Sequence, residues 1–227
     1  AIRRGSQAFK ASQEDIRELL GNTSKRRGLI SALKGIGYFG VGRPQVVGAP
    51  FLVVRNFTNA CNLKCKHCYQ EAGPKPLRDE LTTKEAFDVV DQLNEAGIVA
   101  LSFSGGEPLV RKDFYDAVKY AHNKGIYISV ATNGTLITKK TAEKMRQAGV
   151  EYVEISLDGA IAATHDNFRG MPGTFDRALK AIKNCKEAGI YTCIATTLHK
   201  DNLKEIPDIV ELSKKLRTDR FMLFNFI

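Results

Sequence analysis

Residues 82–106 read TTKEAFDVVDQLNEAGIVALSFSGG, and this stretch contains the repeating unit that decides the fold. It opens with Thr-Thr-Lys-Glu, the pattern of a capping box, which predicts a helix over residues 82–96. Gly97 is placed to end that helix. The apolar run 98–103 that follows predicts a buried strand. A helix, a glycine turn and a buried strand in this order form the second and third elements of a βαβ unit.

The same pattern recurs along the chain. Further runs rich in β-branched and aromatic residues predict strands over 51–57, 126–131, 150–157, 191–198 and 221–227. Further helix-like stretches lie at 111–124, 138–148, 173–188 and 201–217. Strands that alternate with helices predict an α/β fold with a parallel sheet and right-handed crossovers. Six such units fit either a doubly wound sheet or an incomplete barrel, and the periodicity does not choose between them.

Residues 1–50 differ from the core domain expected over 51–227. They hold a short helix candidate at 13–20, and residues 28–48 contain six glycines and one proline. We interpret 1–50 as a leader or linker segment that packs on the core domain. Because no helix follows the last predicted strand, we also expect a further C-terminal region.

Composition excludes several classes of protein. The chain has 227 residues, of which 43% are hydrophobic and 26% charged, which excludes disordered, collagen-like and coiled-coil proteins. No apolar run reaches the length of a membrane span and no signal peptide is visible, so we expect a cytoplasmic protein without a membrane partner. The net charge of +9 is scattered, without a basic tract interleaved with aromatic residues, and therefore does not indicate a nucleic-acid partner.

Cysteine usage is the strongest chemical signal. Three of the five cysteines, Cys61, Cys65 and Cys68, lie within eight residues directly after the first predicted strand. An odd total with this clustering is a poor disulfide framework and indicates a metal or cluster site in a reducing compartment. The other two, Cys185 and Cys193, lie on predicted apolar faces, and we expect them to be buried core thiols.

The spacing Cys-x3-Cys-x2-Cys leaves two kinds of inorganic site open. Three thiolates in one short loop could hold an iron–sulfur cluster with one iron open to a small molecule, whereas fully ligated [4Fe–4S] centres use four cysteines. Structural zinc would need His67 as a fourth ligand. A second candidate feature, Ser104-Gly-Gly-Glu-Pro108, ends the second predicted strand, where glycines allow close approach and a carboxylate can bind an amino group.

Together these residues resemble the radical S-adenosylmethionine (SAM) superfamily, over residues 51–227. The resemblance implies a partial (β/α)6 barrel of the TIM type. Within the superfamily, residues 157–159, 165–169 and 173–175 are similar to members that carry a SPASM or twitch extension.

The resemblance also implies a role for each matching residue. The three clustered cysteines would ligate a [4Fe–4S] cluster, and SAM would chelate the fourth iron. Three residues would bind the SAM amino group: Gly105, Gly106 and Glu107. Five others would contact the rest of SAM: Thr132 and Asn133 the ribose and methionyl part, Ser156 and Arg169 the carboxylate, and Leu198 the adenine.

The implied activity is reductive cleavage of SAM to a 5′-deoxyadenosyl radical that abstracts hydrogen from a substrate. That substrate would be a peptide or protein side chain, a tetrapyrrole or a cofactor precursor, and an electron donor such as ferredoxin or flavodoxin would be a partner. Two other classes stay open, an iron–sulfur protein that does not cleave SAM and a zinc-binding regulatory module. The SAM-binding motifs disfavour the first, because an electron carrier needs no clamp for an aminoacyl group.

Overall fold

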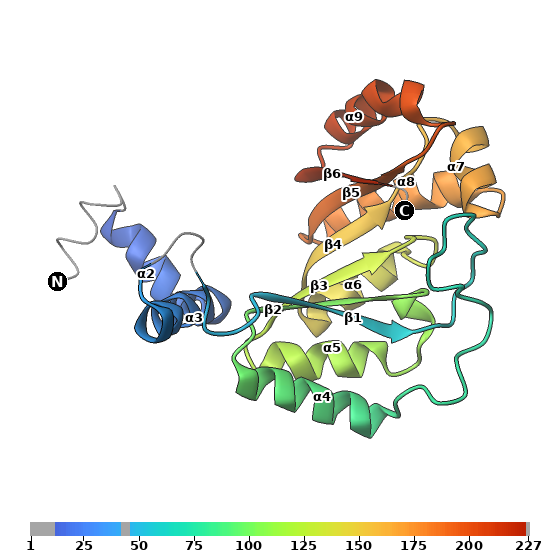
Figure 1. The fold of residues 1–227 in the computed structure, drawn as a ribbon. Helices are drawn as coiled ribbons and strands as arrows, with labels where there is room; N and C mark the ends of the chain where they lie inside the picture. The colour runs from blue at the N-terminus through green and yellow to red at the C-terminus, as the bar shows by residue number, and fades with distance from the viewer. Residues whose placement is uncertain (1–11, 42–45, 226–227) are drawn as a thin grey trace.

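The computed structural model describes residues 12–41 and 46–225, and six parallel strands form its single sheet (Figure 1). The strands are β1 Leu52–Thr58, β2 Ala100–Gly105, β3 Tyr127–Thr132, β4 Val150–Ser156, β5 Tyr191–Leu198 and β6 Arg220–Asn225. They stand in sequence order, with each strand paired in parallel to the next. The strand order never reverses, as it would in a doubly wound sheet. The expected partial (β/α)6 barrel is therefore confirmed.

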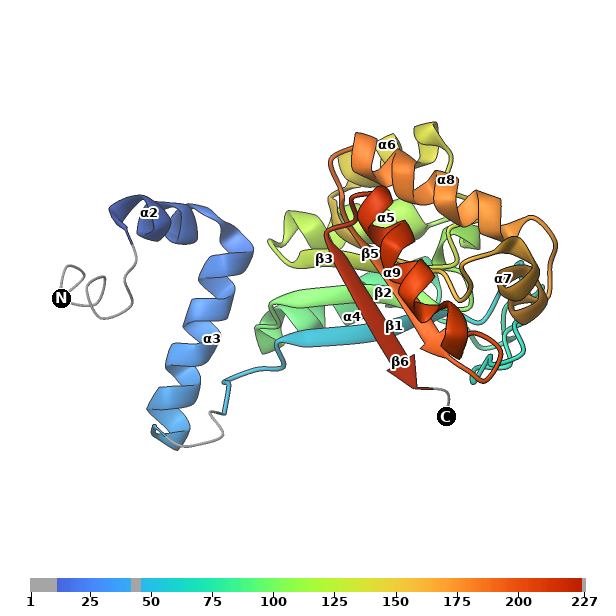
Figure 2. The same cartoon turned by 90° about the horizontal axis from the view of Figure 1, so that it is seen from above.

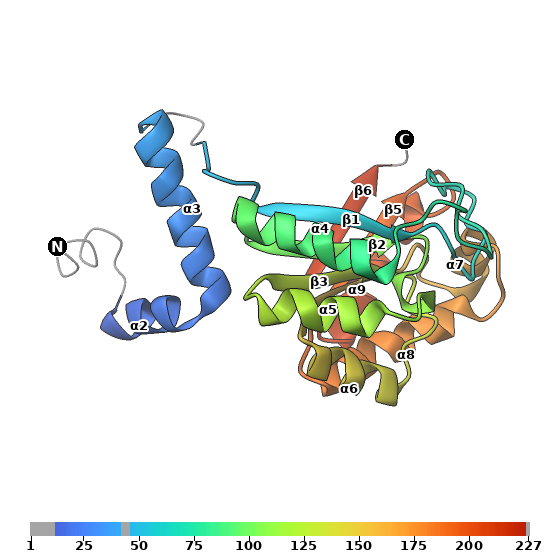
Figure 3. The same cartoon turned by 90° about the horizontal axis from the view of Figure 1, so that it is seen from below.

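Five helices of the described chain connect successive strands and cover the outer face of the sheet (Figures 1 and 3). They are α4 Thr83–Ala96, α5 Phe114–Asn123, α6 Lys139–Ala148, α8 Thr174–Glu187 and α9 Ile206–Lys215, with short 3-10 turns η1 Pro108–Val110 and η2 Leu203–Glu205. Thr82 and Glu85 form the predicted capping box at the start of α4. Each of these helices lies within the stretch that the sequence predicts.

An additional helix, α7 (Ala162–Arg169), follows β4 and was not predicted. It has eight residues, and Ile161 at its N-cap makes no side-chain capping hydrogen bond. A short helix without a capping residue leaves little periodic signal in the sequence. The last turn of α7 nevertheless buries Phe168 and Arg169.

The hydrophobic core lies between the sheet and its outer helices. Phe103 of β2 meets Phe57 of β1 and Phe114 of α5 edge to face, with ring centroids 5.2 Å and 6.0 Å apart. Such aromatic pairs add to the stabilisation from apolar burial. Cys185 and Cys193 have no exposed surface, which confirms that both are buried thiols.

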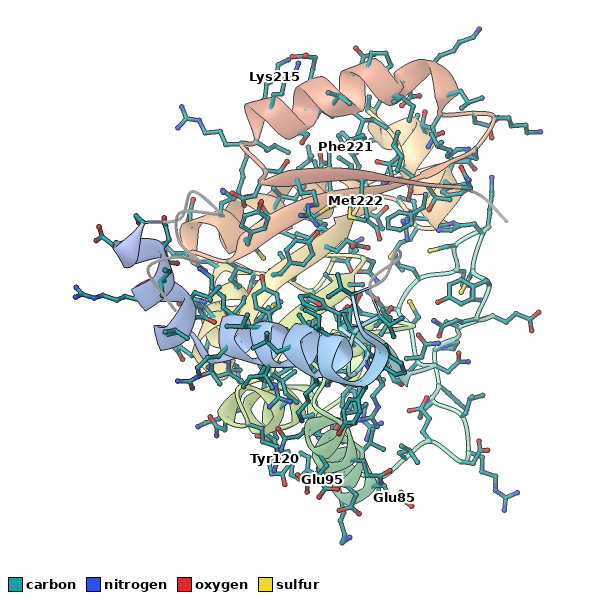
Figure 4. The ribbon with its side chains drawn as sticks, turned by 60° about the vertical axis from the view of Figure 1, so that its left-hand side comes forward. Glu85, Glu95, Tyr120, Lys215, Phe221 and Met222 are labelled. Carbon is teal, nitrogen blue, oxygen red and sulfur yellow. The ribbon has the colours of Figure 1, made fainter. Side chains whose placement is uncertain are left out.

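The concave face of the sheet carries a different set of side chains. Tyr152 of β4 stacks on Tyr191 of β5 with centroids 5.7 Å apart, and its hydroxyl donates to Sδ of Met222 at 3.8 Å. Consecutive residues of a strand alternate between faces, so Met222 points inward while Phe221 packs on the core beneath α9 (Figure 4).

The first helices lie at the edge of the sheet where the strands begin (Figures 1 and 2). They are α2 (Gln13–Gly21) and α3 (Thr23–Phe39), so most of the glycine-rich stretch expected to be a linker is helical. A side chain at Gly35 would collide with the backbone of Val46, and glycine is needed there for this close packing. None of the described helices is long and apolar enough to cross a membrane.

Arg27 anchors α3 to the core domain. Its Nε donates to the carbonyl of Ile98 at 2.8 Å, and its Nη1 donates to Oδ1 of Asn94 at 2.8 Å. Nη1 also reaches the carbonyl of Lys124 at 3.4 Å. One guanidinium therefore ties α3 to the ends of two outer helices and to the segment that leads into β2.

We predict that Arg27→Ala releases α3 from the core domain. The amides of α3 should exchange hydrogen faster, while the core domain keeps its free energy of unfolding because its packing is untouched. Arg26→Ala is the matched control, since the side chain of exposed Arg26 donates hydrogen bonds to Leu20 and Thr23 within the N-terminal helices. Equal exchange in the two variants, measured by mass spectrometry, would contradict the anchor.

Candidate functional site

The candidate residues gather at the edge of the sheet where the parallel strands end. The loop after β1 lies at this edge, beside the last turn of α7 (Figure 1). Motif residues at the ends of β2, β3, β4 and β5 face the same edge, because all six strands run in one direction. This is the end at which barrels of this type place their chemistry.

The three clustered cysteines are half-buried, and each sulfur faces a hydrogen-bond donor. The amide of Leu63 lies 3.4 Å from Sγ of Cys61, and the amide of Ala72 lies 3.3 Å from Sγ of Cys68. Nη1 of Arg169 lies 3.7 Å from Sγ of Cys65. Donors of this kind stabilise thiolates and tune iron–sulfur clusters, so the donor set fits such a cluster.

Burial shapes the acidity of these thiols. It raises the pKa of the Cys61 thiol above its usual range. Burial also raises the pKa of the Cys65 thiol, and the nearby Arg169 guanidinium opposes that rise. Deprotonation of Cys65 is therefore assisted by one fixed positive charge.

A single zinc ion would need the three cysteines and His67 to converge on one point. Among the residues that the structure describes, no three His, Cys, Asp or Glu side chains converge to hold one metal ion. The ring of His67, the expected fourth zinc ligand, lies flat on the ring of Phe168 with centroids 4.2 Å apart. In a [4Fe–4S] cluster each thiolate binds a different iron, so its ligands need not meet at one point.

Gly105 and Gly106 bring the end of β2 against the start of the cysteine loop. The amide of Gly106 donates to the carbonyl of Thr58 at 2.8 Å, and the amide of Glu107 donates to that of Ala60 at 2.8 Å. A Cβ at Gly105 or Gly106 would collide with these same carbonyl oxygens. The two glycines are therefore required by this backbone approach.

Glu107 is a fully buried brace between β2 and β3. Its carboxylate has no exposed surface and accepts hydrogen bonds from the hydroxyl of Thr132 and the amide of Asn133, each at 2.9 Å, and from the amide of Leu109 at 3.2 Å. Burial raises the pKa of Glu107 to about 7, although these donors favour the charged form. The expected contact of this carboxylate with the SAM amino group stays a prediction.

Asn133 links this brace to the cysteine loop. Its Nδ2 donates to Oδ1 of Asn62 at 3.0 Å and lies 3.9 Å from Sγ of Cys61. The structure thus brings Thr132 and Asn133 to the candidate site, where the sequence predicts them.

Arg169 is held by Asp158, for which the strand-end position left two roles open, a structural role in its turn and the orientation of a ligand. Nε and Nη2 of Arg169 each lie 2.5 Å from Oδ2 of Asp158, and Oδ1 of Asp158 accepts from the amide of Thr197 at 2.8 Å. The amide of Asp158 donates to Nδ1 of His165, whose pKa burial lowers to about 4. The sequence signal for Asp158 was its position at the end of a strand, two residues after Ser156.

The remaining predicted residues lie at the same edge. Half-buried Ser156 ends β4 and half-buried Leu198 ends β5. His199, which follows Leu198, stacks on the second face of Phe168 with centroids 3.8 Å apart. His67, Phe168 and His199 thus form one continuous ring stack that the sequence did not reveal.

Comparison with known proteins identifies a family and relatives for this chain. The model of the radical SAM superfamily matches residues 56–213, well over half of the chain. The chain is 42% identical over 176 residues to Fe-coproporphyrin III synthase of Methanosarcina barkeri, covering 78% of this chain and 44% of that protein. It is 31% identical over 181 residues to PqqA peptide cyclase of Bradyrhizobium diazoefficiens, covering 80% of this chain and 48% of that protein. The chain spans about half the length of these curated relatives.

A solved structure shares the fold. The crystal structure of Streptococcus suis SuiB superposes with a TM-score of 0.70, at 22% sequence identity, over 89% of this chain and 45% of that one. At this identity the likeness supports the fold alone.

We predict that Glu107 makes the protein without bound cofactors less stable as pH rises from about 4.5 to 7. The pKa of Glu107 is about 7 in the folded chain and near 4.5 when unfolded, so across this window the folded state binds more protons. Its contribution is complete below pH 4.5 and is lost by pH 7, a change of roughly 3 kcal/mol.

Denaturant unfolding of wild type and Glu107→Gln at pH 5 and pH 7.5 measures this effect. The difference in unfolding free energy between the two proteins should depend on pH, because Gln does not titrate. Glu85→Gln is the control, since the pKa of exposed Glu85 is lowered by its capping bonds to Thr82. A pH-independent difference for Glu107→Gln would contradict the prediction.

Proposed function

This chain belongs to the radical SAM superfamily, and we propose that Cys61, Cys65 and Cys68 ligate three irons of a [4Fe–4S] cluster whose fourth iron binds SAM. The observation that carries the proposal is the cysteine loop itself, in which every sulfur faces an N–H donor at the strand-end edge of the sheet. When bound and reduced, such a cluster would supply the one electron needed to cleave SAM to methionine and a 5′-deoxyadenosyl radical, and this radical would abstract hydrogen from a substrate.

The Gly105-Gly106-Glu107 motif would form the amino-group end of the SAM site. Because the carboxylate of Glu107 is buried and engaged with Thr132 and Asn133, we assign recognition of the amino group to backbone carbonyls near the two glycines. Glu107 would then act by fixing the ends of β2 and β3. Asn133, close to Cys61, would contact the methionyl part or the ribose.

Ser156 and Arg169 would bind the carboxylate of SAM. Arg169 is only 8% exposed, and its Nε and Nη2 are engaged with Asp158. Nη1, which lies beside Cys65, is the atom best placed to reach a carboxylate next to the cluster. Asp158 would keep the guanidinium in this orientation, and Leu198 would contact the adenine.

We further propose that the substrate is a tetrapyrrole and that an external one-electron donor such as ferredoxin or flavodoxin reduces the cluster. The tetrapyrrole assignment is supported by the 42% identity to an Fe-coproporphyrin III synthase, against 31% to a peptide cyclase. A peptide substrate is the alternative that the experiment below distinguishes.

We predict that Cys65→Ala abolishes cluster binding, because two thiolates do not retain the cluster against loss of iron. Iron and sulfide analysis after anaerobic reconstitution should give about four irons per wild-type chain and almost none in the variant. Cys185→Ala is the matched control, since Cys185 is buried in the core on α8. A full iron complement in Cys65→Ala would refute the ligand assignment.

We also predict that a porphyrin stimulates SAM cleavage. With dithionite as reductant, iron coproporphyrin III should raise the rate of 5′-deoxyadenosine formation above the substrate-free rate, because a bound substrate traps the radical productively. A PqqA-type peptide serves as the comparison. Stimulation by the peptide alone, or by neither compound, would contradict the tetrapyrrole proposal.

A further inference from the structure

The last turn of α7 makes an unusual series of contacts with the cysteine loop. Four consecutive residues, 167–170, each contact the loop segment 64–67, about one hundred residues away in sequence. We call residues 167–170 the α7 clamp. Segment 64–67 contains Cys65 and has no helical or strand structure of its own.

Two hydrogen bonds join the clamp to Lys66. The amide of Lys66 donates to the carbonyl of Phe168 at 3.0 Å, and Nζ of Lys66 donates to Oδ1 of Asn167 at 2.9 Å. The first bond engages a backbone carbonyl in the last turn of α7. The loop backbone is thereby fixed beside Cys65.

Ring and charge contacts fix the residues on either side of Lys66. The ring of His67 stacks on Phe168 with an interplanar angle of 3°, and the guanidinium of Arg169 reaches Sγ of Cys65. One turn of helix therefore holds the backbone, a ring and a thiol of the same short loop.

Gly170 completes the clamp because its backbone lies close to the backbone of Lys64 in the loop. Its φ is +74°, and a Cβ at this position would collide with the carbonyl oxygen of Lys64. Gly173, a few residues later, has a φ of +76°, yet a Cβ there would meet only Nη2 of Arg177, at 3.8 Å. The two glycines have the same left-handed backbone, and only Gly170 touches the cysteine loop.

The clamp is itself anchored to the sheet and to α8. Arg169 is bound to Asp158, which follows β4, and Phe168 stacks on His199, which follows β5. The carboxylate of Asp166 accepts hydrogen bonds from the amides of Gly173 and Phe175, at 2.6 Å and 2.8 Å. The clamp is therefore a fixed surface against which the loop lies.

We propose that the α7 clamp preforms the cysteine loop, holding residues 61–68 in the shape that accepts the cluster before iron binds. An irregular loop loses conformational entropy when it is ordered around a ligand, and contacts made during folding remove part of that cost from binding. Asn167, Phe168 and Gly170 act through the loop and are positioning residues, whereas Arg169 also belongs to the proposed SAM site. This inference rests on the proposed function, in which the loop cysteines ligate the cluster.

The test compares Gly170→Ala with Gly173→Ala, which impose similar backbone strain. In the cluster-free protein, the Lys66 amide should exchange hydrogen about tenfold faster in Gly170→Ala, the effect expected for one hydrogen bond. During anaerobic reconstitution the same variant should take up iron and sulfide more slowly and to a lower final content. Gly173→Ala should match wild type in both measurements.

A second pair covers the case in which Gly170→Ala does not fold. Phe168→Leu removes the ring stack and should likewise slow cluster uptake, whereas Phe175→Leu, which removes a ring facing His165, should not. If the two variants of each pair took up the cluster at the same rate and to the same content, the clamp proposal would be overturned and the cysteine assignment would remain intact. A wild-type chain that takes up no cluster would instead refute the proposed function and the clamp with it.

Discussion

The buried ion pair of Asp158 and Arg169 connects the parts of the candidate site. Asp158 has no exposed surface and Arg169 is 8% exposed, so both charges depend on their mutual contact and on further hydrogen bonds. Through Thr197 the pair is tied to β5, and through Cys65 it reaches the cysteine loop. Loss of either partner would leave a buried charge uncompensated beside the thiols. The geometry of the loop, the last turn of α7 and the ends of two strands therefore depend on one interaction.

On the other side of the site, Glu107 likewise connects strand ends to the cysteine loop. It joins the end of β2 to the end of β3 by accepting from Thr132 and Asn133, and Asn133 continues the network to Cys61. The two networks approach the cysteine loop from opposite ends, one at Cys61 and one at Cys65. A loop without regular secondary structure is in this way held by groups that follow four different strands, which parallel strand direction brings to a single edge.

Local patterns predicted most of the fold because its signals are local. Capping residues, glycine turns and apolar runs located the six strands and the five crossover helices. They did not reveal α7, which lacks an N-cap side chain, or α3, whose glycines indicate a linker. In α3 the glycines serve close packing against the chain near Val46, and such a contact between distant segments leaves no periodic pattern in the sequence.

The sequence by itself narrowed the chemistry, because Cys-x3-Cys-x2-Cys after a buried strand limits the inorganic site in this loop to an iron–sulfur cluster or a zinc ion. It also placed the motif residues at strand ends, since their positions follow from strand boundaries. Tertiary structure alone decided how those residues are oriented and which partners they contact. It turned the carboxylate of Glu107 inward, paired Arg169 with Asp158, and set α7 against a loop one hundred residues earlier. Burial and side-chain partners depend on contacts between segments far apart in the chain, and neither spacing nor composition encodes them.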